Sequence, residues 1–412
     1  MDLSEKRWDM KQLLPNGLTM IDLFCGAGIG ACGFKLAGYN IIFAIDNQQF
    51  AVDTYNKNIG GHAICGDIRK LNSNDIPYAD VITGGFPCQP FSFSGKGDGV
   101  NDKDKGDLGY HFYRIVRDKQ PKAFLMENVD GIISKKHRPF FLELMKLFEE
   151  AGYEVTYPMK ENGEPMAINC WEYGVPQLRN RVFVVGIRKD LNKKFEFPKP
   201  IPVDERKNIR YAIGDLPDPD GINNHKGYGI RNDEAPFVDK IPPGGNWRDL
   251  PEEDQKKFLG KAFYSGGGRT GFLRKVKFDN PAYTLTSCMN GKNNAQIIDN
   301  HDKYYDGGFS PRYKSRNRQK QWDEPSFTIV SSARQLPLYP EPANYDIRKM
   351  DTLDVPPPRR FTVRECLRLQ TVPDWFSFND TIPLNKQYER CSGIPSLVAY
   401  KLGIELSNLL KI

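Results

Sequence analysis

The sequence predicts an α/β protein with a mostly parallel sheet, on the strength of three observations. Between residues 18 and 187, short β-rich runs alternate with helical patterns, which is typical of β-α-β units. A glycine-rich turn follows the first run, and polar residues suited to chemistry follow later runs, where open α/β sheets place their sites. From about residue 190 this alternation stops, and frequent Pro and Gly predict a second, smaller and irregular domain.

The predicted strands are the runs richest in β-branched and aromatic residues. They cover residues 18–24, 41–45, 62–65, 80–84, 122–126 and 181–187. One helix is marked by Phe141, Leu144, Met145 and Phe148, which share a face and stop near Gly152. A second helical pattern covers 396–410 and is expected to pack back on the α/β half. The catalytic domain is therefore expected to comprise 1–190 completed by 385–412, with the second domain at 191–384.

Composition limits the class of protein. The chain has 412 residues, 39% of them hydrophobic, which is enough for a large core, and a mild net charge of +6. Its first 20 residues lack an apolar centre, and no window is apolar enough to span a bilayer, so neither secretion nor membrane insertion is expected.

Eight cysteines include no Cys-x-x-Cys pair, so we expect neither a metal site nor a disulfide framework. Most are expected to be small buried hydrophobic residues. These are Cys32, Cys65, Cys170, Cys288, Cys366 and Cys391.

The turn at 22–30 has the features of a nucleotide-cofactor site. Gly26 and Gly28 allow the backbone to turn tightly and lie close to a ligand at a helix N-terminus. Asp46 ends the next strand, about 20 residues on, where a ribose hydroxyl would be held. Asp67 follows a further strand, where an adenine edge can be read. The alternatives are a tight turn without a ligand and a solvated carboxylate at Asp67.

Cys88 is the cysteine that does not fit a core position. It stands between Pro87 and Gln89-Pro90, in a stiff loop at the carboxyl end of the run 80–84. The Gly-rich stretch that follows, 91–107, is either a lid over a substrate or a plain surface loop.

Glu127 ends the next strand and is therefore expected beside Cys88. A carboxylic acid there can protonate a ring nitrogen, which makes the ring electrophilic toward a thiolate. The alternative roles for Glu127 are capping a turn or pairing with a surface Lys. In the run 177–181, alternation along an extended strand places Gln177, Arg179 and Arg181 on one face. Fork-shaped donors suit a carbonyl oxygen and phosphates, and the alternative is a solvated strand edge.

In this order and spacing, these pieces resemble the C5-cytosine methyltransferase family, the enzymes that methylate cytosine in DNA. The resemblance covers 22–30, 85–92, 126–129, 177–181, 359–376 and the C-terminal helix. It implies a Rossmann-like methyltransferase domain and a target-recognition domain at 191–384. It also implies that 359–370 is an amphipathic helix organising that domain, on which Glu365 and Arg368 are spaced to pair. One block departs from the family pattern, which usually reads Gly-Asn-Ser-Val at this point, because Cys391–Val398 contains no Asn.

The resemblance implies S-adenosylmethionine as cofactor and no metal. Phe24 would stack on adenine, Gly26 and Gly28 would give close approach, and Asp46 would bind the ribose. Asp67 and Ile68 would lie at the adenine edge.

It implies, further, that a flipped-out cytosine is attacked at C6 by Cys88. Glu127 would donate to N3 and bind the exocyclic amine, and Arg181 would hold O2. Arg179 would support the site, and a water near Gln89 would remove the C5 proton.

Two loops of the second domain, 266–277 and 307–321, are basic and contain interleaved Gly, Ser, Asn and aromatic residues. Given the resemblance, we expect them to contact double-stranded DNA, whereas such runs otherwise form solvated faces. The basic residues expected at the DNA are Arg269, Arg274, Lys275, Arg312, Lys314, Arg316 and Arg318.

Three other functions remain open from the sequence. They are methylation of cytosine in RNA, DNA binding without turnover, and nicotinamide-dependent dehydrogenation. The last fits the glycine turn but leaves Cys88 unexplained. By resemblance, the setting is bacterial restriction-modification, in the cytoplasm, with a monomer on DNA and no obligate protein partner.

Overall fold

The structure is a computed structural model of the chain. It describes residues 6–87, 108–213, 215–216, 235–238, 240–241, 246–260, 263, 325–327 and 361–411. These ranges contain nearly all of the predicted α/β half. Cys88, Gln89 and the seven basic residues expected at DNA lie outside them.

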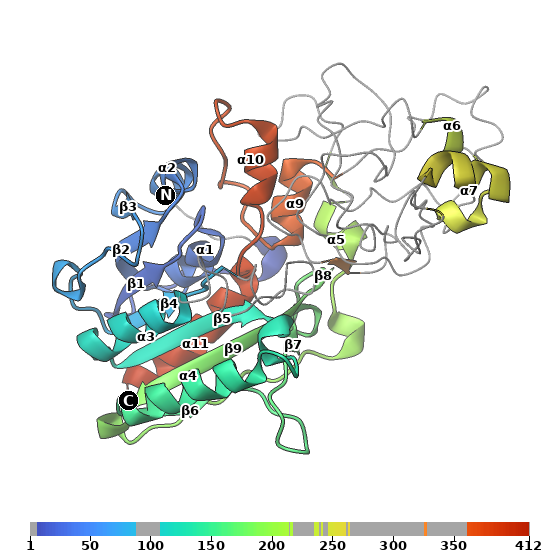
Figure 1. The fold of residues 1–412 in the computed structure, drawn as a ribbon. Helices are drawn as coiled ribbons and strands as arrows, with labels where there is room; N and C mark the ends of the chain where they lie inside the picture. The colour runs from blue at the N-terminus through green and yellow to red at the C-terminus, as the bar shows by residue number, and fades with distance from the viewer. Residues whose placement is uncertain are drawn as a thin grey trace.

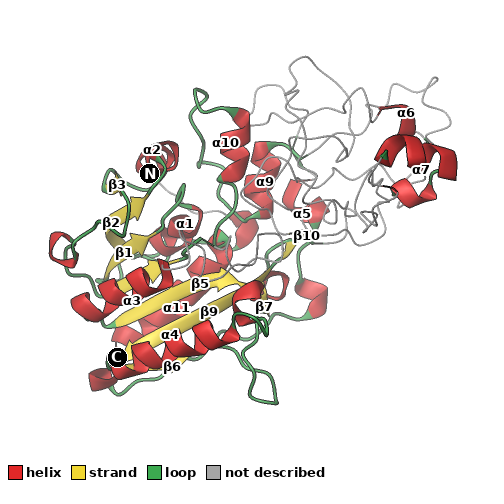
Figure 2. Cartoon of the chain, in the orientation of Figure 1, coloured by secondary structure: helices red, strands yellow, loops and turns green. Residues whose placement is uncertain are grey.

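The central sheet has the order β3-β2-β1-β4-β5-β9-β6. The first five strands are parallel, whereas β9 runs antiparallel to both of its neighbours (Figure 2). Their bounds are β1 Thr19–Leu23, β2 Asn40–Asp46, β3 Ala63–Cys65, β4 Val81–Gly84, β5 Ala123–Val129, β6 Tyr153–Thr156 and β9 Asn180–Arg188. The short β7 (Ile168–Asn169) also pairs with β9, and β8 (Gln177–Leu178) pairs with β10 (Ser326–Phe327). The predicted α/β class with a mostly parallel sheet is confirmed.

Helices cover both faces of this sheet, because successive residues of its strands point to opposite sides (Figure 1). Met20 and Leu125 face a core with α1 (Ile29–Leu36), α2 (Gln49–Asn58) and α11 (Ser396–Lys411). Ile21 and Phe124 face the other core, with α3 (Leu108–Lys119) and α4 (Arg138–Glu150). The predicted stripe on α4 is buried in this second core.

The C-terminal helix α11 packs directly on α1. At Gly33 of α1, an added Cβ would overlap the Ser396 carbonyl oxygen and lie 2.7 Å from the Tyr400 nitrogen. Tyr39 reinforces the junction by donating from its hydroxyl to the Gly403 carbonyl oxygen at 2.9 Å. The expected return of the C-terminus to the α/β half is confirmed.

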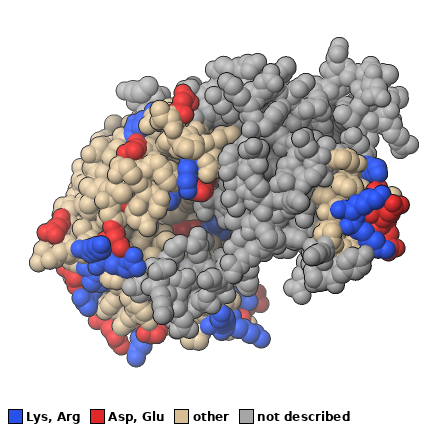
Figure 3. Space-filling model, turned by 45° about the horizontal axis from the view of Figure 1, so that its top comes forward, with Lys and Arg blue, Asp and Glu red and all other residues tan. Residues whose placement is uncertain are grey.

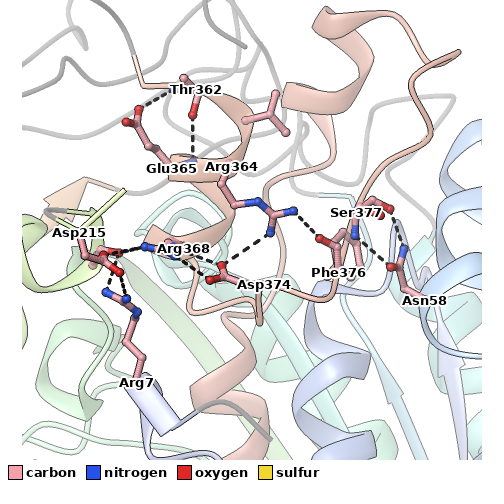
Figure 4. Close-up of polar contacts among 12 residues, drawn as sticks. Arg7, Asn58, Asp215, Thr362, Arg364, Glu365, Arg368, Asp374, Phe376 and Ser377 are labelled. Carbon is pink, nitrogen blue, oxygen red and sulfur yellow. Dashed lines mark hydrogen bonds and ion pairs between the residues drawn. The ribbon is translucent and has the colours of Figure 1, made fainter. Parts of the chain in front are cut away.

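The late helix α9 (Val363–Leu369) differs from expectation in two ways. It is not amphipathic, since every residue in it is buried, with α5 (Ile209–Ile213) and α10 (Leu384–Glu389) against it. The expected pairing of Glu365 with Arg368 is also wrong (Figure 4). The Glu365 carboxylate accepts from the Thr362 backbone nitrogen at 2.7 Å as part of a capping box. Arg368 instead pairs with Asp374 at 2.6 Å and Asp215 at 2.7 Å.

The cysteine expectations are confirmed for Cys32, Cys170, Cys366 and Cys391, which are buried. Cys65 is exposed, so the expectation of burial was wrong there. It ends the edge strand β3, of which only Ala63 is buried. Cys288 lies outside the described residues.

Two further helices, α6 (Ala235–Val238) and α7 (Glu252–Leu259), belong to the predicted second domain. On α7, Lys256 pairs with Glu252 and Lys257 with Glu253, and Figure 3 shows both charge signs side by side there. Among the helices that the structure describes, none is both long enough and apolar enough to cross a membrane.

Candidate active site

The sheet changes its direction of winding between β1 and β4. From β1 the chain proceeds to β2 and β3 on one side, and from β4 to β5 on the other. In open α/β sheets ligands bind beyond the carboxyl ends of the strands at such a point, here those of β1 and β4, and we refer to this position as the crevice. The turn at Phe24–Gly28 leaves β1 there, and Gly85–Pro87 leaves β4.

The turn after β1 depends on backbone conformations that favour glycine. Gly26 and Gly28 have φ values of 52° and 90°, and a Cβ on Gly28 would lie 2.8 Å from the Ile59 side chain. Asp46, at the end of β2, holds the turn. Its Oδ2 accepts from the Gly26 nitrogen and its Oδ1 from the Gln48 nitrogen, each at 3.0 Å.

Phe24 adopts a strained conformation in the same turn, with φ of 58° in a bulky residue. Its half-buried ring meets the Phe86 ring edge to face, with centroids 6.3 Å apart. The two turns at the crevice are thus in contact through these rings.

Asp22 is a carboxylate that the sequence analysis did not single out. It lies on β1 between Ala44 of β2 and Thr83 of β4, and it is buried. Burial, together with the weaker effect of the nearby Asp46 charge, raises the pKa of Asp22 to about 8. The sequence feature that could have indicated Asp22 is the presence of a carboxylate within a mostly apolar strand.

Asp67 and Ile68 follow β3, which pairs with β2 so that Cys65 lies opposite Asp46. The Asp67 carboxylate pairs with the Arg69 guanidinium at 2.8 Å, and hydrogen bonds from Arg69 hold its pKa below the usual value. Ile68 is buried in the α3 and α4 core. Asp67 therefore has the properties of a partly solvated turn residue at the rim of the sheet.

Glu127 and Arg181 form a largely enclosed ion pair. Arg181 Nε lies 2.8 Å from Glu127 Oε1, and the two side chains are 9% and 13% exposed. Glu127 also lies against the segment leaving β4, because a Cβ on Gly85 would be 2.7 Å from Glu127 Oε2. The expected position of Glu127 beside Cys88 stays a prediction, because Cys88 lies outside the described residues, but Glu127 does lie at the exit of β4. The alternative roles, capping a turn or pairing with a surface Lys, do not agree with the observed pairing to Arg181.

Asn128 ties the same segment to β5. Its Nδ2 donates to the Phe86 carbonyl oxygen at 3.3 Å, and its Oδ1 accepts from the Val129 nitrogen at 2.9 Å. The chain is thus held up to the residues directly before Cys88.

The run at 177–181 alternates as predicted, with Gln177, Arg179 and Arg181 all buried. The solvated-edge alternative is wrong. Their partners differ, however: Gln177 donates to the Leu369 carbonyl oxygen at 3.1 Å and Arg179 to that of Gly393 at 2.7 Å. Of the three, Arg181 is the one paired with Glu127, while Gln177 holds α9 and Arg179 holds the final block.

The final block, which differs from the family pattern, is therefore anchored by Arg179. Directly before it, Arg390 lies with Nη2 3.8 Å from Asp46 Oδ1 and its guanidinium over the Phe50 ring. The sequence did not lead us to Arg390. The only feature that could have indicated it is its position directly before the final block, which lacks the usual Asn. Among the described residues there is no group of three or more side chains suited to a metal ion.

Comparison with known proteins agrees with this geometry. A family model described as C-5 cytosine-specific DNA methylase matches residues 18–407. The Type II methyltransferase M.FnuDI of Fusobacterium nucleatum is 35% identical over 400 residues, covering 95% of each chain. M.MthTI of Methanothermobacter thermautotrophicus is 35% identical over 367 residues, covering 88% of each.

Among solved structures, the Entamoeba histolytica methyltransferase EhMeth shares the fold. The TM-score is 0.58 at 14% identity, over 96% of this chain and 99% of that one. The resemblance seen in the sequence is confirmed. The chain belongs to the C-5 cytosine-specific DNA methylase family and is a DNA cytosine-5 methyltransferase with S-adenosylmethionine as methyl donor.

Proposed function

We propose that the enzyme methylates cytosine within a specific duplex DNA sequence through a covalent bond between Cys88 and C6 of the base. The observation that carries this proposal is the enclosed Glu127–Arg181 pair, packed against Gly85 three residues before Cys88. Such a pair presents an acid and a fork of donors where a ring can be held.

The crevice residues fit the cofactor. When bound, S-adenosylmethionine supplies an electrophilic methyl group on its sulfonium. Gly26 leaves the approach to the turn open, since it carries no Cβ, whereas the missing Cβ of Gly28 lets the turn pack against the Ile59 side chain. Asp46 holds its carboxylate at the end of β2 and retains acceptor capacity for a ribose hydroxyl beyond its two backbone bonds. Phe24 presents a half-buried ring for adenine, and Asp67 and Ile68 follow β3 at the same carboxyl edge of the sheet.

The proposed steps begin with a flipped-out base, because C5 and C6 cannot be reached within the stack. Glu127, carrying a proton, donates to N3 and accepts from the exocyclic amine, while Arg181 binds O2. The Cys88 thiolate forms a bond to C6, which makes C5 nucleophilic. S-adenosylmethionine, held by Phe24 and Asp46, would supply the methyl group to C5 and would leave as S-adenosylhomocysteine as its sulfur–methyl bond breaks. A water positioned by Gln89 takes the C5 proton, and the returning electron pair expels Cys88 as thiolate.

We further propose that 1–190 and 385–412 form the catalytic domain and that 191–384 recognises the target. Contact between α5 and α9, from the two ends of 191–384, supports this grouping. In it, the basic residues of 266–277 and 307–321 contact DNA. The Type II names of the relatives support a restriction-modification setting. We propose that the enzyme acts there as a monomer in the cytoplasm.

Trapping tests the covalent proposal. The protein is incubated with S-adenosylmethionine and random-sequence duplexes in which 5-fluorocytosine replaces cytosine. Fluorine at C5 cannot leave as a proton does, so we expect an adduct that survives denaturation. Cys88→Ser should abolish it, whereas Cys65→Ser, which removes the exposed thiol of β3, should not. Sequencing the trapped DNA identifies the target.

An adduct that persists in Cys88→Ser would refute the role of Cys88. An adduct formed on RNA and not on DNA would move the substrate to RNA. Retention of DNA without any adduct would favour a binding protein that has lost turnover.

A further inference from the structure

Arg390 reaches the cofactor crevice from a distant part of the chain. It follows α10, and its backbone nitrogen donates to the Gln387 carbonyl oxygen at 3.1 Å. Its guanidinium carbon lies 5.3 Å from the centre of the Phe50 ring, at the start of α2. Its Nη1 would lie 3.9 Å from a Cβ on Gly26. The guanidinium is thus held beside the turn proposed to carry the cofactor.

The hydrogen-bonding capacity of this guanidinium is unused within the described part of the chain. Its Nε is buried without a hydrogen-bond partner there. The separation of 3.8 Å from Asp46 Oδ1 allows charge attraction but exceeds hydrogen-bond distance. Asp46 is already bonded to two backbone nitrogens, so the turn does not need Arg390 to hold it. A buried donor without a partner is costly unless a ligand completes it.

The charges around the crevice indicate which group of a ligand would accept hydrogen bonds from Arg390. Asp22 and Asp46 are both acidic and close enough for the Asp46 charge to raise the Asp22 pKa. The Asp46 carboxylate suits the ammonium and sulfonium of S-adenosylmethionine and opposes its carboxylate. Lys386 also lies over Phe50, but it pairs with Glu389 at 2.9 Å. Arg390 is therefore the cation placed to offset the repulsion.

We propose that Arg390 binds the carboxylate of the methionine part of S-adenosylmethionine. A guanidinium can engage a carboxylate through two parallel hydrogen bonds. Arg390 thereby supplies a cofactor contact from the residue next to the block that lacks the usual Asn. The proposal rests on the cofactor placement given above.

The test compares two ligands that differ only in this carboxylate. Dissociation constants of S-adenosylhomocysteine and its decarboxylated analogue are measured by calorimetry on the full chain without DNA. We expect the wild type to prefer the carboxylate by about 10- to 100-fold, the range for hydrogen bonds to a charged group. Arg390→Gln should lose this preference, because the variant should bind S-adenosylhomocysteine more weakly and the decarboxylated analogue as before. Arg390→Lys should retain part of the preference.

Arg206 provides a matched control. It lies over the Trp171 ring at 4.9 Å and 3.8 Å from Glu172, as Arg390 lies over Phe50 and near Asp46. Arg206→Gln should leave both dissociation constants unchanged.

Equal weakening of both ligands by Arg390→Gln would overturn the proposal, because Arg390 would then act through Asp46 or the fold. Equal affinity of the wild type for the two ligands would overturn it even if the variant failed to fold. If the wild type bound neither ligand, the cofactor placement itself would be refuted.

Discussion

Gly85 lacks a side chain where the Glu127 carboxylate needs the space. An alanine Cβ there would lie 2.7 Å from Glu127 Oε2, so the carboxylate would have to move. We expect Gly85→Ala to lower methyl transfer to DNA by about 10- to 100-fold, because small misplacements of a reacting group are costly. Labelled methyl transfer measures this, with thermal unfolding as a check on the fold.

Gly61→Ala is the control for this change, since nothing lies within 4 Å of a Cβ there and its φ is not positive. It should retain wild-type transfer. Full activity in Gly85→Ala would show that the placement of Glu127 does not limit the reaction.

Asp22 should make the protein less stable as the pH rises. Its pKa is 3.8 in the unfolded chain and about 8 in the folded one, so the folded state binds more protons between these values. The free energy of unfolding therefore falls across this window. Asp22→Asn removes the effect, and we expect a gain at pH 9 of at most about 5 kcal/mol, from a shift of about four pKa units.

At pH 4 the same variant should unfold like the wild type, which urea titrations at the two pH values can establish. Asp67→Asn is the control, because Arg69 lowers the pKa of Asp67 and no gain at pH 9 is expected. A pH-independent difference for Asp22→Asn would contradict the assignment.

At the level of elements, the crossing of α1 and α11 depends on Gly33. Its missing side chain admits the Ser396 carbonyl oxygen and the Tyr400 nitrogen, which are backbone atoms and cannot move aside cheaply. We expect Gly33→Ala to lower the free energy of unfolding by about 1 to 3 kcal/mol through overpacking. Chemical denaturation measures this, and Gly61→Ala again serves as control.

Because α1 begins at the cofactor turn, Gly33→Ala should also weaken the binding of S-adenosylhomocysteine. A stable variant with unchanged affinity would mean that α11 can shift without disturbing the turn.

At the level of the whole molecule, Asp215 and Arg368 connect segments far apart in sequence (Figure 4). Asp215, just after α5, pairs with both Arg7 near the N-terminus and Arg368 of α9. Arg368 also pairs with Asp374, and Arg364 donates to the Phe376 carbonyl oxygen at 2.8 Å. The network joins the start of the chain to both ends of the proposed recognition domain.

We expect Arg368→Met to lower the free energy of unfolding by about 1 to 2 kcal/mol, since Arg368 is buried but its two acidic partners are about half exposed. Arg117→Met, which breaks the exposed pair with Asp118, should change it by less than about 0.5 kcal/mol. Equal effects in thermal unfolding would contradict a special role for the network.

From the sequence one could predict six strands of the sheet, the covering of both its faces by helices and most of the residues at its carboxyl edge. Residue periodicity carried this information, because the faces of a strand or helix are set by local geometry. It placed Glu127 at the exit of β4 and the buried alternation of Gln177, Arg179 and Arg181 on one face. The roles of Cys88, Gln89 and the seven basic residues remain predictions.

Which side chains meet is apparent only from the folded chain. Periodicity could not show that α9 is enclosed on all sides, that Arg179 holds Gly393, or that Arg390 lies beside Asp46. Each of these contacts joins segments separated by more than a hundred residues or depends on the packing around a helix. Partner choice is set by how distant elements pack, whereas local spacing specifies only the direction in which a side chain leaves its own element.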